Sequence, residues 1–381
     1  MKRVAVLCAV LFILAPLPVW GEEDISGELI QSYSELYGQQ LEQGAGELLS
    51  SGVPYAEGFN LSELISRIAA GEIPIEPKTL AKELLYALFG GVVSAARTMA
   101  AVVAVVMLSS LLSGITDGFS QSGAGKAAYY VCFMTVTALA ASAFYDCVST
   151  AASTIENLGL FMACIVPVMV TALLASGAVI SAAAIEPTLI GIIQISVALI
   201  KNIFVPLVMV GTGLGIINSM SESLKTTRLI TLVNSWVKYG LSVSLTIFAA
   251  FAGLRSIAAS GADALTLKLT KFASSNLIPV VGGILSDSVE TVIRCSAVIK
   301  NAVGIGGVVL VFFIAVTPII NIISVMVVFR ITAAFCEPVA SKSMAECISC
   351  MANGISMAFS MLVAVTVMFI IIITIMINIS V

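Results

Sequence analysis

Residues 303–330 read VGIGGVVLVFFIAVTPIINIISVMVVFR, and residues 354–381 read GISMAFSMLVAVTVMFIIIITIMINISV. The first run carries no charge before its last residue, and the second carries none. The hydrocarbon core of a bilayer is about 30 Å thick, and a helix of about 20 apolar residues crosses it. Both runs are therefore long enough to span a membrane. Further runs of this kind lie upstream, so the sequence predicts a polytopic membrane protein.

The composition agrees with this prediction. Of the 381 residues, 59% are hydrophobic and 10% are charged, and the mean hydropathy is +1.09. Soluble domains carry about 25% charged residues. Histidine is absent, which removes the commonest general base and a frequent zinc ligand. We expect no catalytic site, no cofactor, no metal site and no nucleic-acid partner; the CxxC pair of Cys347 and Cys350 is a weak signal for a metal, because no second pair accompanies it.

The first 84 residues predict two extracytoplasmic features. Residues 1–21 resemble a signal peptide, with basic residues at the start, an apolar run over 4–14 and Gly21 before the expected cleavage point. An uncleaved anchor is the alternative. Residues 22–84 hold more than half of the chain's 22 acids. Short cytoplasmic segments collect Lys and Arg, so this acidic helical segment is expected outside the cytoplasm.

The remaining chain predicts an all-α fold with six to eight transmembrane helices. A first bundle is expected over 85–254, an amphipathic non-spanning region over 255–301 and a pair of spans over 302–381. Within the first bundle, the apolar runs predict separate spans at 127–148 and 158–180, joined by an acidic loop between Asp146 and Glu156. A further span is expected at 231–254, with Trp236 and Tyr239 as interface anchors.

The segment 185–220 is apolar except for Lys201 and contains Pro187 and Pro206. It is too long for one upright span at 1.5 Å per residue, so two half-helices or two spans joined near Lys201 are expected. A charge at membrane depth is costly and is usually functional or paired, although Lys201 at a turn among the headgroups explains the sequence equally well. The residues expected to line a permeation path are Lys201, Asn202, Glu186 and Glu337.

Residues 284–300 predict an amphipathic helix. Lys300 and Arg294 are expected on its polar face. Its apolar face is expected to dock on the membrane surface or on a partner protein. The residues predicted for this docking face are Leu285, Val289, Val292 and Ile293.

Three short stretches carry a resemblance to a known family. They are IPVVGG at 278–283, SD at 286–287 and KNAVG at 300–304. With the leader and the acidic segment, they make the chain similar to the stage III sporulation protein AE family of endospore-forming bacteria.

The resemblance implies a membrane subunit of the secretion-like channel complex between mother cell and forespore, needed for sporulation after engulfment. The implied location is the mother-cell membrane facing the forespore. The implied partners are other membrane proteins of the stage III sporulation operon, including an ATPase and ring-forming subunits, besides the lipid bilayer itself. A stand-alone secondary transporter or permease for a small solute is the alternative function.

Overall fold

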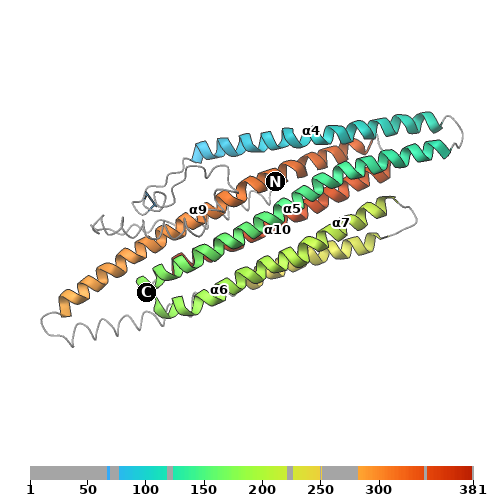
Figure 1. Ribbon diagram of the computed structural model, residues 1–381. Coiled ribbons are helices and arrows are strands. Elements are labelled where there is room, and N and C mark those ends of the chain that lie inside the picture. Colours follow the sequence, from blue (N-terminus) through green and yellow to red (C-terminus); the bar gives the residue numbers. More distant parts are fainter. Residues whose placement is uncertain are drawn as a thin grey trace.

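The computed structural model describes residues 67–68, 77–117, 123–220, 226–248, 250, 282–338 and 341–379. All regular elements in these ranges are helices, which confirms the predicted all-α class. Figure 1 shows them as an elongated bundle in which the helices run roughly along one axis. The predicted signal peptide, most of the acidic segment and residues 251–281 lie outside the described residues.

Four long helices build one side of the bundle: α4 (Pro77–Asp117), α5 (Gly123–Ala175), α9 (Gly282–Cys336) and α10 (Lys342–Asn378). The longest, α9, has 55 residues, which at 1.5 Å per residue is about 80 Å. This length is more than twice the thickness of a bilayer core. Length and apolarity qualify five described stretches as candidate membrane spans, so the chain is polytopic. The predicted number of six to eight spans remains a prediction.

The other side is a helical hairpin. One rod consists of α6 (Val179–Leu199), the π-helical turn η1 (Ile200–Phe204) and α7 (Val205–Met220), and a helix over 227–248 follows it. The chain reverses between α5 and α6 through Gly177, whose φ of 87° suits glycine. The amide of Ala178 donates to the carbonyl of Leu173, as expected for a helix that ends in a left-handed residue.

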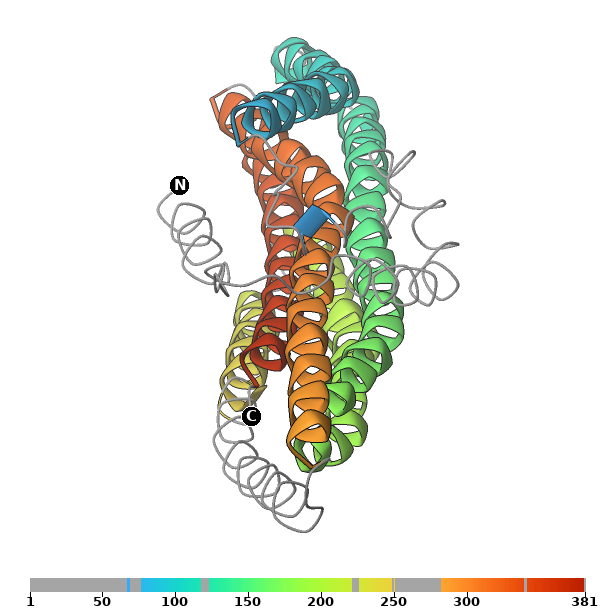
Figure 2. The ribbon, with the colours of Figure 1, turned by 90° about the vertical axis from the view of Figure 1, so that its left-hand side faces the viewer.

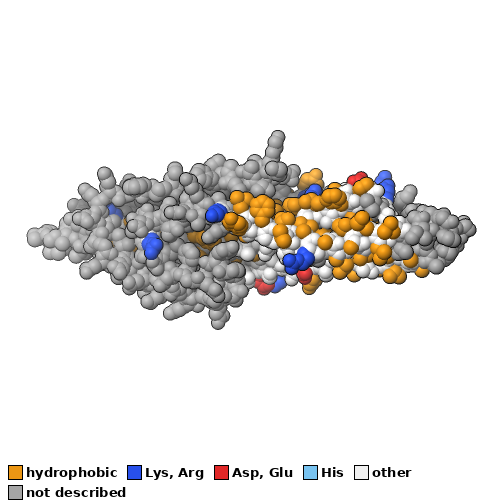
Figure 3. Space-filling view, turned by 90° about the horizontal axis from the view of Figure 1, so that it is seen from above, with side chains coloured by type: hydrophobic (Ala, Val, Ile, Leu, Met, Phe, Trp, Pro, Cys, Tyr) orange, Lys and Arg blue, Asp and Glu red, His pale blue; other side chains and the backbone are white. Residues whose placement is uncertain are grey.

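The core lies around α10, which packs against α9, α5 and α7 (Figures 1 and 2). Phe369, Met361 and Ile355 are fully buried on it. Glycines allow the close approach: a Cβ added to Gly304 would lie 2.3 Å from Cγ1 of Ile377. Outside this core, apolar side chains dominate the described surface, as on the face that carries α4 in Figure 3.

The predicted loop between Asp146 and Glu156 is wrong. Helix α5 continues through both residues without a break. Residues 146–156 contain neither Gly nor Pro and include two alanines, so their backbone favours helix, and the two acids alone do not interrupt it. The span expected at 127–148 and the span expected at 158–180, as far as Ala175, are parts of one helix.

Helix α9 also runs without a break through residue 301, where the sequence predicted a domain boundary. The prediction that Lys300 lies on a polar face is wrong, because the side chain is only 2% exposed. Its ammonium donates to the carbonyl of Ile379, which follows the last turn of α10. The negative end of a helix dipole favours a cation there.

Candidate functional site

An interhelical ion pair joins α5 to the α6–α7 rod. Nζ of Lys201 lies 2.7 Å from Oε1 of Glu156, within hydrogen-bonding distance. Both side chains are 47% exposed. The pair therefore lies on the outer surface of the bundle, in two stretches that are otherwise long and apolar enough to cross a membrane.

The π-helical turn places Lys201 beside α5. The amide of Val205 donates to the carbonyl of Ile200, five residues back instead of four. Pro206 follows directly and has no backbone N–H, so the regular ladder cannot continue across this point. A π-turn inserts one extra residue into a helix and occurs frequently at functional sites. The expected interruption near Lys201 is present, but the rod continues in the same direction, so the alternative of two spans is excluded.

The structure does not bring the four predicted path residues together. Asn202 follows Lys201 and is exposed. Glu186 is half-buried on α6, about 22 Å along the helix from Lys201. Glu337 lies in the turn after α9, where its amide donates to the carbonyl of Ala333. The sequence missed Glu156 as the partner of Lys201, because it assigned that acid to a loop.

Of the four residues predicted to dock, the structure describes the surroundings of Ile293, which is half-buried on α9. The side chains of Leu285, Val289 and Val292 lie outside the described part, although their backbone belongs to the same helix. Their docking role stays a prediction.

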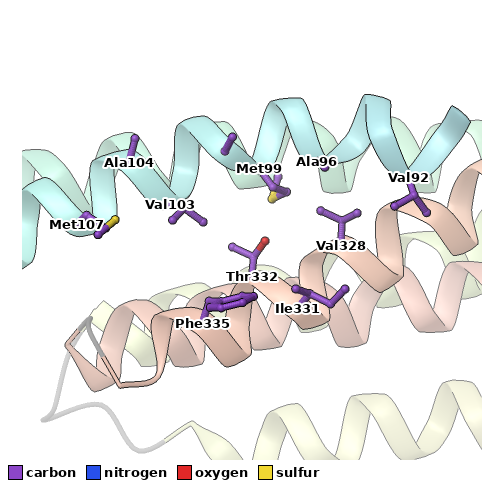
Figure 4. A pocket seen from close by; sticks show the side chains of 11 residues that line it. Val92, Ala96, Met99, Val103, Ala104, Met107, Val328, Ile331, Thr332 and Phe335 are labelled. Atoms are coloured by element: carbon purple, nitrogen blue, oxygen red, sulfur yellow. The ribbon is translucent and has the colours of Figure 1, made fainter. Parts of the chain in front are cut away.

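An apolar groove lies between α4 and α9 (Figure 4). Its volume is about 500 Å³, and Thr332 is its polar lining residue. Met99 and Val103 point into it from α4, and Phe335 lies on the α9 side. This groove can accommodate hydrocarbon, and the hydroxyl of Thr332 is the polar side-chain group in its lining.

The CxxC cysteines pack between helices. Sγ of Cys347 lies 3.6 Å from the hydroxyl of Thr137 on α5, and Sγ of Cys350 lies 3.8 Å from the carbonyl of Thr212 on α7. Both cysteines are free thiols. Within the described ranges, no three His, Cys, Asp or Glu side chains come close enough together to hold a metal ion. The two cysteines pack as small side chains at helix interfaces.

The fold defines a polytopic all-α membrane protein, and an interhelical ion pair lies on the surface of its bundle. The model of the stage III sporulation protein AE family matches residues 59–380. The chain belongs to this family, as its sequence motifs predicted.

The match extends to a curated relative. The chain is 29% identical over 326 residues to Stage III sporulation protein AE of Bacillus subtilis (strain 168). The alignment covers 86% of this chain and 81% of that protein. No solved structure matches the chain.

Proposed function

We propose that the protein is a membrane subunit of a secretion-like channel complex between mother cell and forespore, and that sporulation needs it after engulfment. The observation that carries this proposal is the family match over 59–380. The candidate spans support a role inside a membrane. The ion pair at the π-turn supports a conduit, because charged side chains in membrane spans usually face a water-filled cavity or a bundle interior.

In this proposal, the protein lies in the mother-cell membrane facing the forespore. Lys201 and Asn202 line the path, and Glu186 and Glu337 contribute at other levels of the bundle. The face of Leu285, Val289, Val292 and Ile293 docks on a partner from the same complex, such as a ring-forming subunit or an ATPase subunit. Substituting Val289→Asp places a charge on this face, so co-purification of membrane partners should fall while the protein still inserts. Unchanged co-purification would exclude this docking face.

Deleting the gene in its native host tests the function. We expect normal vegetative growth and an arrest of sporulation after engulfment, seen by membrane staining and by counts of heat-resistant spores. The wild-type gene at a second locus should restore spores. Normal sporulation together with a vegetative defect in uptake or export would contradict the proposal and favour a stand-alone transporter.

A further inference from the structure

A polar stripe runs along the outward face of α5. Its members are all exposed and follow one another at spacings of three or four residues, so they share one side of the helix. They are Ser142, Asp146, Ser149, Ser153 and Glu156. Lys201 and Asn202 widen the stripe across the neighbouring rod. Among the described residues, no ion pair or hydrogen bond joins the carboxylate of Asp146.

The packing of α5 against α9 gives the depth of the ion pair. A Cβ added to Gly307 would lie 2.2 Å from Cδ1 of Ile165, and one added to Gly304 would lie 3.0 Å from Cε of Met169. The two helices are therefore antiparallel, and Glu156 is level with about residue 316 of α9.

Residues 301–329 of α9 contain no charged side chain. This stretch is about 43 Å long, and a crossing of about 20 residues placed anywhere inside it includes residues 310–320. The Glu156–Lys201 pair consequently lies at hydrocarbon depth for every such placement. If the bundle is tilted, more than 20 residues are needed for a crossing, so the set of residues that every crossing includes becomes larger than 310–320.

Helix α10 gives the same depth. A Cβ added to Gly354 would lie 2.6 Å from Cε2 of Phe144, and Cys347 contacts Thr137, so α10 and α5 run parallel. Glu156 is then level with about residue 366 of α10. Residues 347–378 are free of charge, and a crossing of about 20 residues inside them always includes residues 359–366.

The serines and the ions of the stripe differ in whether they can face lipid. The hydroxyls of Ser142 and Ser153 donate to carbonyls of their own helix, at 3.0 Å and 3.1 Å, so these serines tolerate lipid. The half-exposed ions of Glu156 and Lys201 do not, because a charge in contact with hydrocarbon costs several kcal/mol.

The two ends of the stripe lie at different depths in the bundle. Ser142 is level with the exposed Arg330 of α9, where the uncharged stretch of that helix ends. Beyond Glu156, the next exposed side chains of α5 are Leu160 and Ala163, which are apolar. The polar surface therefore begins at the edge of the apolar layer and ends at the ion pair.

We propose that this stripe is the wall of a water-filled half-channel, closed at its inner end by the Glu156–Lys201 pair. Water and small hydrophilic solutes occupy it, entering from the end of the bundle where α9 connects to α10. The role of the half-channel rests on the proposed conduit function. The half-channel assigns the path to α5, the helix in which the sequence predicted a loop between Asp146 and Glu156.

Cysteine labelling in native membranes tests the half-channel. Thiols react as thiolates, which form in water and not in hydrocarbon. Ser149→Cys and Ser153→Cys should react with a membrane-impermeant maleimide at least roughly tenfold faster than Val210→Cys. Val210 is a matched control, because it is 55% exposed and apolar, and lies near the level of Asp146 on the other helix layer. The described native cysteines are buried or half-buried, and the labelling of the unsubstituted chain gives their background together with that of Cys8.

Equal labelling of Ser149→Cys, Ser153→Cys and Val210→Cys would overturn the half-channel, whether lipid or a partner helix covers the stripe. Immunoblots of the membranes establish that each variant accumulates; if one serine variant fails to accumulate, the other gives the answer. The two proposals fail separately. If the serine variants label fast but deleting the gene leaves sporulation normal, the half-channel stands and the sporulation function is wrong. If they label slowly but deletion arrests sporulation, the sporulation function stands and the half-channel is wrong.

Discussion

Helix α10 and the α6–α7 rod are both apolar enough to cross a membrane, yet they occupy different environments. Inside the bundle, 67% of the most apolar window of the span Lys342–Asn378 is buried, against 22% for Glu186–Met220. Helix α10 carries its charges, Lys342 and Glu346, only in its first turns, whereas the rod carries an exposed lysine in its middle. Two stretches that both qualify as candidate spans, with mean hydropathies of 2.9 and 2.0, therefore form a structural core in one case and a surface with a polar site in the other.

The largest effect is expected from Phe369→Ala on α10. This side chain is fully buried, and truncating a buried Phe costs about 3–5 kcal/mol through lost contacts and a residual cavity. The protein should accumulate poorly in membranes, as measured by immunoblotting. Ile195→Ala on α6 is the control, because Ile195 is 68% exposed and should tolerate truncation. Equal losses for both variants would remove the distinction between the two helices.

A smaller effect is expected from Lys201→Ala. The substitution leaves Glu156 without its partner. Because the pair is half-exposed, the loss in stability should fall between the values for surface and buried ion pairs, at about 1–3 kcal/mol. Spore counts should fall while the protein still inserts. Exchanging the two charges, with Lys201→Glu and Glu156→Lys together, should restore much of the loss. If the exchanged pair behaves no better than Lys201→Ala, the two residues do not act as a pair.

Pro206→Ala should act on the pair indirectly. It restores a backbone N–H, which allows a regular ladder in place of the π-turn and rotates Lys201 away from α5. Membrane accumulation of Pro206→Ala should fall, and adding Lys201→Ala should lower it little further, because the pair is already lost. Fully additive losses, measured by immunoblotting, would show that the π-turn does not position Lys201.

The smallest effect is expected from Ser153→Ala. The hydroxyl of Ser153 donates to the carbonyl of Thr150 on its own helix, and the side chain is exposed. Membrane accumulation should stay at the wild-type level, corresponding to a change within about 0.5 kcal/mol. A large loss would mean that this hydroxyl makes an intermolecular contact.

Hydropathy by itself determined the all-α membrane class, because a bilayer leaves no partner for backbone groups except within helices or closed barrels. The sequence also located the interruption at Lys201, since a charge and a nearby proline at membrane depth are both exceptional. The three short motifs, together with the leader and the acidic segment, suggested the family, and the family match confirms it.

The tertiary structure alone decided how far each helix runs and which charges meet. Asp146 and Glu156 suggested a loop because polarity is the usual sign of one, but a backbone without Gly or Pro continues as a helix when neighbouring helices pack along it. Glu156 and Lys201 are separated by 45 residues, so no local pattern could pair them. Lys300 was expected in water and is buried, because α10 ends beside it and supplies a carbonyl that accepts a hydrogen bond from its ammonium.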